Sequence, residues 1–442
     1  MNLEVLFAKA KALGITEIES YEVTNDTTSI AVFDGKVEDT KTAKTVVTFY
    51  RGAYQGHLGS FYVENNKMSE DEILDRIIEN AKIINENDPY IIYAGDKEYP
   101  KVIPNEADFA DHSNHEKIAL VLSLEREIRA QSPLVVATES VSYHERSYKY
   151  RIRNSLGLDV TKSGAIAYLV AGAVIERDGE VKTSFDINIG KKFNDLDYQK
   201  LAANIVSDAI RQLGGAPIKS GNYRTVIKNT VMNDLLEAYS SIFSALASIR
   251  KMSLLTGKEG TKVFGENINI YDDPLCPFAL NQDAFDDEGV ASYQKTLVEK
   301  GIFKTFLHNL KTAKMFNAKS TANGYKDGVS SPVGVRPSNM YIPNGDKSLD
   351  ELFALCGDGV YLTEITGLHA GINVVSGAFS LQSAGYVIRD GHLAEPISLI
   401  VTSGNFIELL NNVLAIGNNL DFKGGNIASP ALLVKELAIS GK

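Results

Sequence analysis

The chain has 442 residues, of which 44% are hydrophobic, and 56 acidic against 45 basic residues give a formal net charge of −11. This length predicts two or three domains with sizeable cores, and the acidic balance disfavours nucleic acid as the main partner, because a phosphate-binding surface needs a basic field. No apolar run is long enough for a membrane span, and two cysteines, Cys276 and Cys356, give neither a disulfide framework nor a CxxC pair, which favours a reducing cytoplasm.

Residues 1–104 are expected to form a first α+β unit. An amphipathic helix over 2–13 stops at Gly14, and a second helix begins after the N-cap Ser69. Between the helices lie four strand-length runs with turn signals between them, at 21–24, 28–33, 46–50 and 57–63. Strands grouped in this way predict an antiparallel meander rather than βαβ units. The proline-containing stretch 88–104 is expected to be a linker.

Residues 105–217 are expected to form a second α+β unit. We expect helices over 115–130 and 198–213 and strands over 135–141, 145–153 and 165–175. A glycine-rich boundary follows the last helix. Within 145–153, Tyr148 and Tyr150 alternate with Lys149 and Arg151. Basic and aromatic residues together can bind nucleic acid, but alternation with period two is typical of any half-exposed antiparallel strand, so we prefer a solvated strand face.

Residues 218–442 are expected to form a larger, mixed but mainly antiparallel, β-rich domain. A strand over 224–227 precedes a long apolar helix over 230–249. Near the end, five short apolar runs alternate with glycine-containing turns, at 360–362, 372–375, 378–381, 385–388 and 397–401. Asp390-Gly391 predicts a type I′ hairpin, because that turn needs positive φ at both central residues. The expected fold class is therefore α+β.

Familiar catalytic motifs are missing from the chain, which contains no GxSxG, Walker A or GxGxxG pattern. His115-Glu116 and His144-Glu145 lack the second histidine one turn further on that a zinc helix needs. His369 lies in a glycine-flanked loop beside Glu364, where it could act as a general base. Structural histidines are the commoner outcome of such a position.

Several stretches resemble the PmbA/TldD family, whose members are also called modulators of DNA gyrase. The clearest is TEITGLHAGINVVSGAFSLQSAGYVIRDG at 363–391, and FDDEGVASYQKTLVEKGIFKTFLHNLKTAKMF at 285–316 is another. Shorter matches lie at 154–157, 220–223 and 337–348. Together they extend the resemblance over nearly the whole chain.

The resemblance implies a subunit type that holds no metal. In this family two related subunits form a peptidase, and only the TldD type binds zinc, through an HExxxH helix and a cysteine near its C-terminus. Aligned by the neighbouring strand and Asp-Pro, the two histidine positions fall on Asn233 and Ala238, and the glutamate position on Asp234. No histidine lies between 144 and 308, and no cysteine follows Cys356. The chain is therefore similar to the PmbA/TldE type, with no cofactor and no catalytic residues of its own.

The resemblance also implies a partner and a substrate class. We expect a cytoplasmic, non-catalytic subunit that completes a peptidase with a zinc-bearing TldD-like subunit, acting on unfolded or flexible peptides. Glu364, His369, Asn373 and Ser376 are expected to line a partner-facing cavity. The alternative is a homodimeric peptide-binding or scaffold protein that needs no TldD-like partner. Nucleic acid and membrane partners are not expected.

Overall fold

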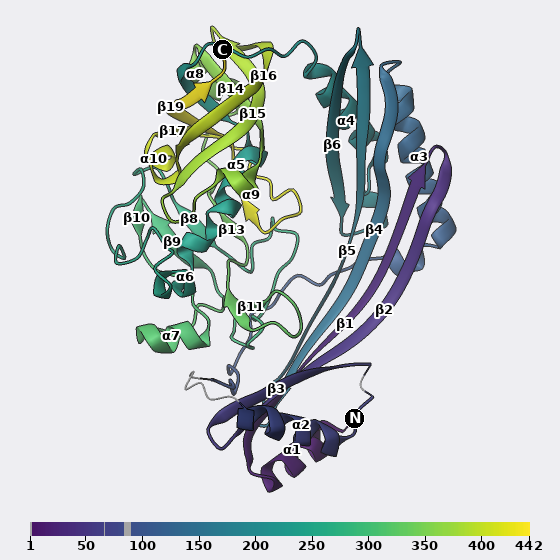
Figure 1. Cartoon of the computed structure of the whole chain (residues 1–442), viewed down its shortest axis with the longest axis vertical. Helices are drawn as coiled ribbons and strands as arrows, with labels where there is room; N and C mark the ends of the chain where they lie inside the picture. Colours follow the sequence, from purple (N-terminus) through teal and green to yellow (C-terminus); the bar gives the residue numbers. More distant parts are fainter. Residues whose placement is uncertain (1, 66, 84–89) are drawn as a thin grey trace.

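The structure is a computed structural model that describes residues 2–65, 67–83 and 90–442. Its first half forms one six-stranded antiparallel sheet, called here the long sheet, with the strand order β3-β2-β1-β4-β5-β6. These strands are β1 (Ile15–Phe33), β2 (Lys36–Tyr54), β3 (His57–Glu64), β4 (Val135–Asn154), β5 (Asp159–Arg177) and β6 (Glu180–Gly190). The long sheet arches beside the C-terminal half (Figure 1). Because β1 pairs with β4, the two units expected over 1–104 and 105–217 share one sheet.

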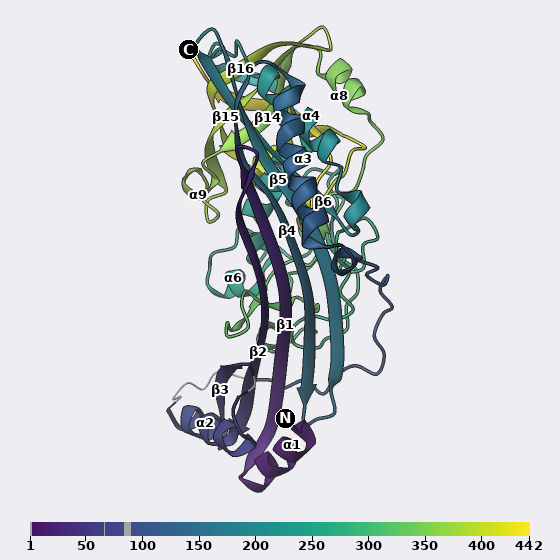
Figure 2. The ribbon, with the colours of Figure 1, turned by 90° about the vertical axis from the view of Figure 1, so that its right-hand side faces the viewer.

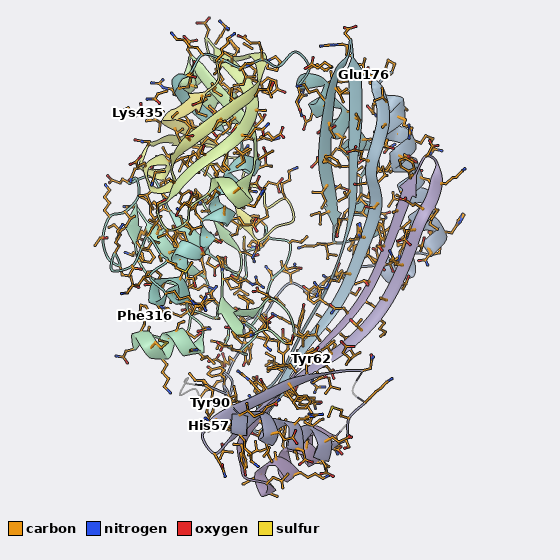
Figure 3. The ribbon with its side chains drawn as sticks, viewed as in Figure 1. His57, Tyr62, Tyr90, Glu176, Phe316 and Lys435 are labelled. Atoms are coloured by element: carbon orange, nitrogen blue, oxygen red, sulfur yellow. The ribbon has the colours of Figure 1, made fainter. Side chains whose placement is uncertain are left out.

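Four strands of the long sheet contain 19 or 20 residues each. The runs 21–24 and 28–33, predicted as separate strands, are parts of β1, and β4 likewise joins two predicted runs. The polar residues between the runs do not end the strand, because neighbouring strands pair with them on both sides. Asn25, for example, lies opposite Thr45 and Tyr148. In Figure 3, His57 and Glu176 mark opposite ends of the long sheet.

Helices cover the long sheet at two places. At one end lie α1 (Leu3–Ala12) and α2 (Glu70–Ile83), which bury a small apolar core against β1, β2 and β3. Toward the other end, α3 (Asn114–Gln131) and α4 (Tyr198–Arg211) cover the face that is turned away from the C-terminal half (Figure 2). The helix ends follow local signals, since Gly14 after α1 has a φ of +85° that favours glycine.

The predicted linker over 88–104 is only partly described. Residues 88 and 89 lie outside the described residues, and residues 90–104 contain no helix or strand. Single 3₁₀ turns follow at Phe109–Asp111 and Phe193–Asp195. Among the described residues, no helix is both long enough and apolar enough to cross a membrane.

The C-terminal half contains a six-stranded sheet in the order β16-β15-β14-β7-β19-β17. Its strands are β7 (Gly221–Ile227), β14 (Gly359–Thr366), β15 (Ala378–Arg389), β16 (His392–Asn405), β17 (Val413–Ile416) and β19 (Leu432–Ser440). β7 and β14 run parallel, the other neighbours are antiparallel, and an added β16–β19 pairing curls the sheet back on itself. This confirms an α+β fold with a mixed, mainly antiparallel, β-rich C-terminal part.

Two local sequence signals in this sheet can be compared with the structure. Asp390 and Gly391 both have positive φ, 48° and 78°, as the predicted hairpin requires. The prediction of a strand over 372–375 is wrong. Only Ile372 forms a single bridge, and the Asn373 side chain then accepts backbone hydrogen bonds that close a turn instead. The runs 378–381 and 385–388 are one strand, β15.

The predicted helix over 230–249 is also wrong as a single element. It is α5 (Asn229–Ala238), a 3₁₀ turn over Ser240–Phe243, and α6 (Ala245–Ile249). Leu307 breaks it, because its N–H donates to the Phe243 carbonyl at 2.8 Å and its carbonyl accepts from the Ala245 N–H at 3.0 Å. A helical repeat in the sequence cannot report this tertiary pairing.

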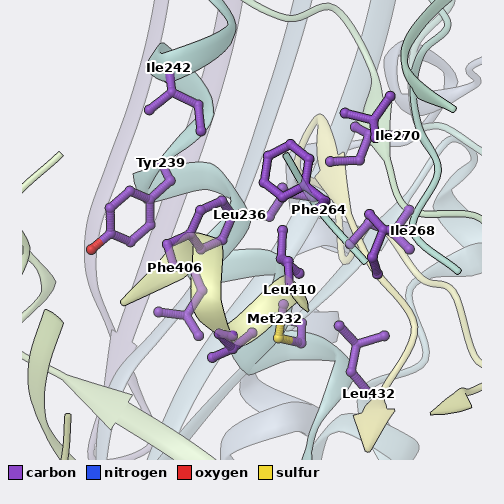
Figure 4. Close-up of a cluster of buried hydrophobic side chains, with 14 of the residues drawn as sticks. Met232, Leu236, Tyr239, Ile242, Phe264, Ile268, Ile270, Phe406, Leu410 and Leu432 are labelled. Atoms are coloured by element: carbon purple, nitrogen blue, oxygen red, sulfur yellow. The ribbon is translucent and has the colours of Figure 1, made fainter. Parts of the chain in front are cut away.

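The main core of the C-terminal half lies between α5 and the inner face of the curled sheet. Figure 4 shows its apolar side chains, with the Tyr239 and Phe406 rings stacked 4.4 Å apart. Short elements surround it, namely β8 (Ile270–Asp272), β9 (Lys295–Glu299), β10 (Ile302–Phe303), α7 (Leu310–Phe316), β11 (Gly324–Lys326), β12 (Val333–Val335), β13 (Met340–Tyr341), α8 (Leu349–Cys356), α9 (Leu368–Gly371), α10 (Phe406–Asn411) and β18 (Ile427–Ala428). β8, β9, β10, β13 and β18 form a second, small sheet.

A buried polar centre holds this small sheet together. The Asp272 carboxylate at the end of β8 is fully buried, and it pairs with the Lys295 ammonium of β9 at 2.9 Å. It also accepts hydrogen bonds from the Ser338 N–H at 2.7 Å, the Ser338 hydroxyl at 2.9 Å and the Asn323 amide at 2.8 Å. Segments distant in the sequence are thus fixed to one carboxylate.

Candidate functional site

Helix α5 carries the three positions where the resemblance places zinc chemistry. Asn233 is buried, and its amide nitrogen donates to the Asp421 carbonyl at 2.8 Å while its amide oxygen accepts from the Ser429 N–H at 2.7 Å. Asp234 lies on the exposed side of the helix, where partial desolvation and then the charge of Glu237 raise its carboxyl pKa. Ala238 offers no donor atom. The Asn233 amide is therefore engaged in fixing the segment 421–429.

We expect the change Asn233→Ala to lower the free energy of unfolding by about 2–3 kcal/mol, because it leaves the buried Ser429 N–H and the part-buried Asp421 carbonyl without this partner. Urea unfolding of the whole chain measures this loss. Asn229→Ala is the matched control on the same helix. Asn229 is less buried, and its side-chain amide donates one hydrogen bond, to the Asn419 carbonyl at 3.2 Å. If Asn233→Ala lowers the free energy of unfolding no more than the control does, the Asn233 amide does not fix the segment 421–429.

The residues on α5 do not fit a zinc centre. Zinc sites in proteins are built from imidazole, thiolate and carboxylate groups, and an amide or a methyl group cannot replace two imidazoles. Across the described part of the chain, no three His, Cys, Asp or Glu side chains lie close enough together to hold a metal ion. Of the three α5 positions, Asn233 has its amide engaged by the backbone of the segment 421–429.

The four residues expected to line a partner-facing cavity lie at one border of the C-terminal sheet. Glu364 belongs to β14, His369 to α9, and Asn373 and Ser376 to the turn before β15. All four are exposed, and the Asn373 side chain accepts from the N–H groups of Val375 and Ser376 at 3.0 Å each. None of the four lines either of the two clefts described below. Their role in binding stays a prediction.

Beside these residues lies an uncharged strip of the C-terminal sheet, called here the outer sheet face. Its members are exposed or half-exposed neutral side chains of three neighbouring strands: Ser380, Gln382, Leu399, Val401, Ser403, Ala438 and Ser440. Leu399 is 72% exposed and adopts a φ of +55° where the β15–β16 register shifts. A leucine in left-handed backbone costs free energy, and such strain often marks a functional surface.

A cleft of about 640 Å³ lies between the long sheet and loops of the C-terminal half, and is called here the central cleft. Lys162 of β5 joins its two walls, with its ammonium 3.5 Å from the Asp283 carboxylate and 3.3 Å from Asp287. Burial opposes the charged form of Lys162, but these two carboxylates outweigh it and raise the lysine pKa. Because Lys162 lies opposite Tyr150 across the β4–β5 ladder, its ammonium also lies over that ring, 5.5 Å from the centroid.

Most of the other cationic side chains around the central cleft lie over aromatic rings. Lys326 lies over the Phe49 ring at 3.5 Å, and burial lowers its pKa to about 7. The Tyr148 ring lies across β5 above Gly164, where a Cβ atom would be 2.4 Å from its hydroxyl, and that hydroxyl donates to the Asn281 side chain at 3.3 Å. Glycine at this position thus lets the ring reach the opposite wall.

The alternation in β4 agrees with the prediction of a half-exposed strand, but the sequence did not show what the aromatic side chains contact. Tyr148 and Tyr150 line the central cleft, whereas Lys149 is exposed and Arg151 pairs with the Asp159 carboxylate at 2.8 Å. In the sequence the acidic FDDEG stretch stands out only through its resemblance to the family. No sequence signal connects it to Lys162, because their contact depends on how the two halves of the chain meet.

A second cleft, of about 450 Å³, lies nearby between β6, α4 and two loops of the C-terminal half. It shares Leu280 and Gly424 with the central cleft, and its rim includes Phe278, which is 77% exposed. The segment around Asp421 lines this second cleft and is the one that Asn233 fixes. The α5 position that the resemblance aligns with a zinc ligand therefore supports the wall of a cleft.

Comparisons with known proteins agree with this architecture. Residues 107–213 match the model of the PmbA/TldA metallopeptidase central domain, and residues 220–441 match that of the PmbA/TldA metallopeptidase C-terminal domain. A protein of Archaeoglobus fulgidus named metalloprotease is 29% identical over 93% of this chain and 94% of its own length.

Solved structures give the same result. A Thermotoga maritima protein described as a candidate modulator of a DNA gyrase is 30% identical, with a TM-score of 0.92 over 99% of both chains. The structure of TldE from Thermococcus kodakarensis has a TM-score of 0.88 and 22% identity over 99% of this chain and 100% of that one, a likeness of fold.

Proposed function

The chain belongs to the PmbA/TldD metallopeptidase family, and from this membership we propose that it is a cytoplasmic, metal-free subunit of the TldE type. In this proposal it completes a peptidase together with a zinc-bearing TldD-like subunit. The complex cleaves unfolded or flexible peptides, and this chain supplies binding surface and structural support.

The observation that carries the proposal is the state of helix α5. The helix is intact and well packed, but Asn233 and Ala238 occupy the ligand positions, and the Asn233 amide is already used by Asp421 and Ser429. A change of the pH or of the metal supply cannot turn this donor set into a zinc site. Any metal-dependent peptide cleavage then requires a second chain.

The outer sheet face is the surface that we assign to the partner. Its seven side chains are neutral, with Glu364 on the same face at its border, and it exposes Leu399 and Val401 to solvent. Interface cores are depleted of charge, and exposed apolar side chains on a sheet face are a common docking feature. Glu364, His369 and Asn373 lie near this face, and we assign them to the same interface.

Purified protein, alone and mixed with a zinc-bearing TldD-like subunit, tests the proposal. We expect no stoichiometric zinc and no cleavage of an unfolded peptide by the lone chain, and chelator-sensitive cleavage by the mixture. Leu399→Glu is expected to abolish complex formation, because it places a charge in the interface. Leu156→Glu, in an exposed turn of the long sheet, is the matched control.

Three results would contradict the proposal. Zinc bound at one ion per chain, with chelator-sensitive activity of the lone chain, would make it an enzyme by itself. A native complex that contains only this chain would favour the alternative, a homodimeric peptide-binding or scaffold protein. Equal complex formation by both glutamate variants would remove the outer sheet face as the docking surface.

A further inference from the structure

The central cleft contains two arginines that have no carboxylate partner among the described residues. Arg146 of β4 donates to the Asn25 side chain at 2.7 and 2.9 Å and to the Tyr150 hydroxyl at 2.8 Å, all neutral groups. Arg336 has only the Tyr325 ring, 4.4 Å from its guanidinium carbon. Neither arginine forms an ion pair within the described part of the chain, although the sequence has an excess of acidic residues.

These arginines differ from the other cations of the cleft. Lys162 is already matched by two carboxylates, those of Asp283 and Asp287. Burial lowers the pKa of Lys326 to about 7, and its ammonium donates to the Val329 carbonyl at 2.8 Å. The guanidinium groups therefore keep full charges that the protein does not neutralise. Arg146 uses Nε and one terminal nitrogen for Asn25 and Tyr150, which leaves its other terminal nitrogen for an oxyanion. Within the described part of the chain the Arg336 guanidinium donates no hydrogen bond, so it can offer two parallel N–H groups to an oxyanion.

Tyr325 is an independent sign of a missing ligand. Its side chain is 3% exposed and lines the cleft beneath Arg336, yet its hydroxyl has no hydrogen-bond partner. Burial and the nearby carboxylates hold its pKa well above the usual value, so the hydroxyl stays protonated and can donate. Buried polar atoms are normally paired, so an unpaired hydroxyl on a ring that lines the cleft is an exception.

From these contacts we infer that the central cleft is a binding site for a small ligand bearing a carboxylate or phosphate group, with Arg146 and Arg336 as its charged arms and Tyr325 as a donor at its floor. The volume of about 640 Å³ lies within the range of small-molecule sites. Asp327 also lines the cleft and is exposed, and it forms no ion pair with the residues that the structure describes, so it opposes the anion. Such a site does not depend on the proposed peptidase function.

Calorimetry on the full chain at low ionic strength tests the site. The probes are trialanine with a free C-terminal carboxylate, trialanine amide, and inorganic phosphate. We expect saturable binding of at least one of the two anions, weakening as NaCl is added, and no binding of the amide. Binding of the peptide alone identifies a terminal carboxylate as the ligand group, and binding of phosphate alone identifies a phosphate.

Variants assign the binding to the cleft. Arg336→Gln and Arg146→Gln are each expected to weaken binding about 10-fold or more, as for loss of a charge-assisted pair, and Asp327→Asn to strengthen it a few-fold. Arg250→Gln, which removes an exposed arginine remote from the cleft, should bind as the unaltered chain does. Arg146, Arg250 and Arg336 are exposed, so we expect the three arginine variants to unfold at the same temperature as the unaltered chain. Absence of anion binding, or equal weakening in Arg250→Gln, overturns the inference.

Discussion

The change Asp272→Ala is expected to lower the free energy of unfolding by about 3–5 kcal/mol, the usual result of removing one partner from a buried ion pair. The Lys295 side chain is 2% exposed and the Asp272 side chain 0%, so alanine leaves an ammonium buried without its counter-charge. Three hydrogen-bond donors, from Ser338 and Asn323, lose their acceptor as well. Few single substitutions elsewhere in the chain would remove as many buried polar contacts.

Urea unfolding of the variants measures this effect and separates its causes. The double variant Asp272→Leu with Lys295→Met should recover part of the loss, because it removes both charges together. Asp39→Ala breaks the exposed ion pair with Lys41 and serves as the control, with a far smaller expected loss because solvent screens that pair. A loss no larger than this control in Asp272→Ala would mean that the small sheet does not depend on this carboxylate.

Local chemistry explains which parts of the fold the sequence could predict. Gly14 ends α1 and Asp390-Gly391 turns a hairpin because backbone preferences of a few residues decide such features. The alternation in β4 was likewise visible, since it requires only that one face be more buried than the other. Predictions of this kind involve neighbours in the sequence and hold without knowledge of the partner segment.

Apart from the strand expected over 372–375, which a local turn at Asn373 replaces, the wrong predictions concern pairing between distant segments. The helix from 230 is interrupted because Leu307 pairs with its backbone, and β1 continues through polar residues because two strands pair with it. The central cleft has the same origin, since Lys162 meets Asp283 and Asp287 only after both halves have folded. Sequence alignment to the zinc motif found Asn233 but could not show that its amide fixes the segment 421–429.

The FDDEG stretch at 285–289 predicts that the free energy of unfolding falls as the pH rises. Asp286 and Glu288 are buried, with 0% and 4% exposed. Burial, and then their neighbouring carboxylates, raise the pKa of Asp286 to about 7 and that of Glu288 to about 8, although backbone N–H donors oppose this. Unfolded carboxyl groups titrate near pH 4, so between about pH 4 and 8 the folded chain holds protons that the unfolded chain has released.

The sign follows from linkage, which makes the free energy of unfolding fall by about 1.4 kcal/mol per pH unit for each such proton. We expect urea unfolding to show this fall between pH 5 and pH 8, and Glu288→Gln to reduce its slope. Glutamine removes the titrating group but can still accept the Leu310 N–H, now 2.7 Å from the carboxylate. Glu351→Gln, at an exposed helix cap, is the control and should keep the original slope. Equal slopes in all three proteins would show that Glu288 is ionised throughout this range.

Lys326 acts in the opposite direction above pH 7, because its folded form has then released a proton that the unfolded lysine still holds. The fall in the free energy of unfolding should therefore end near pH 8.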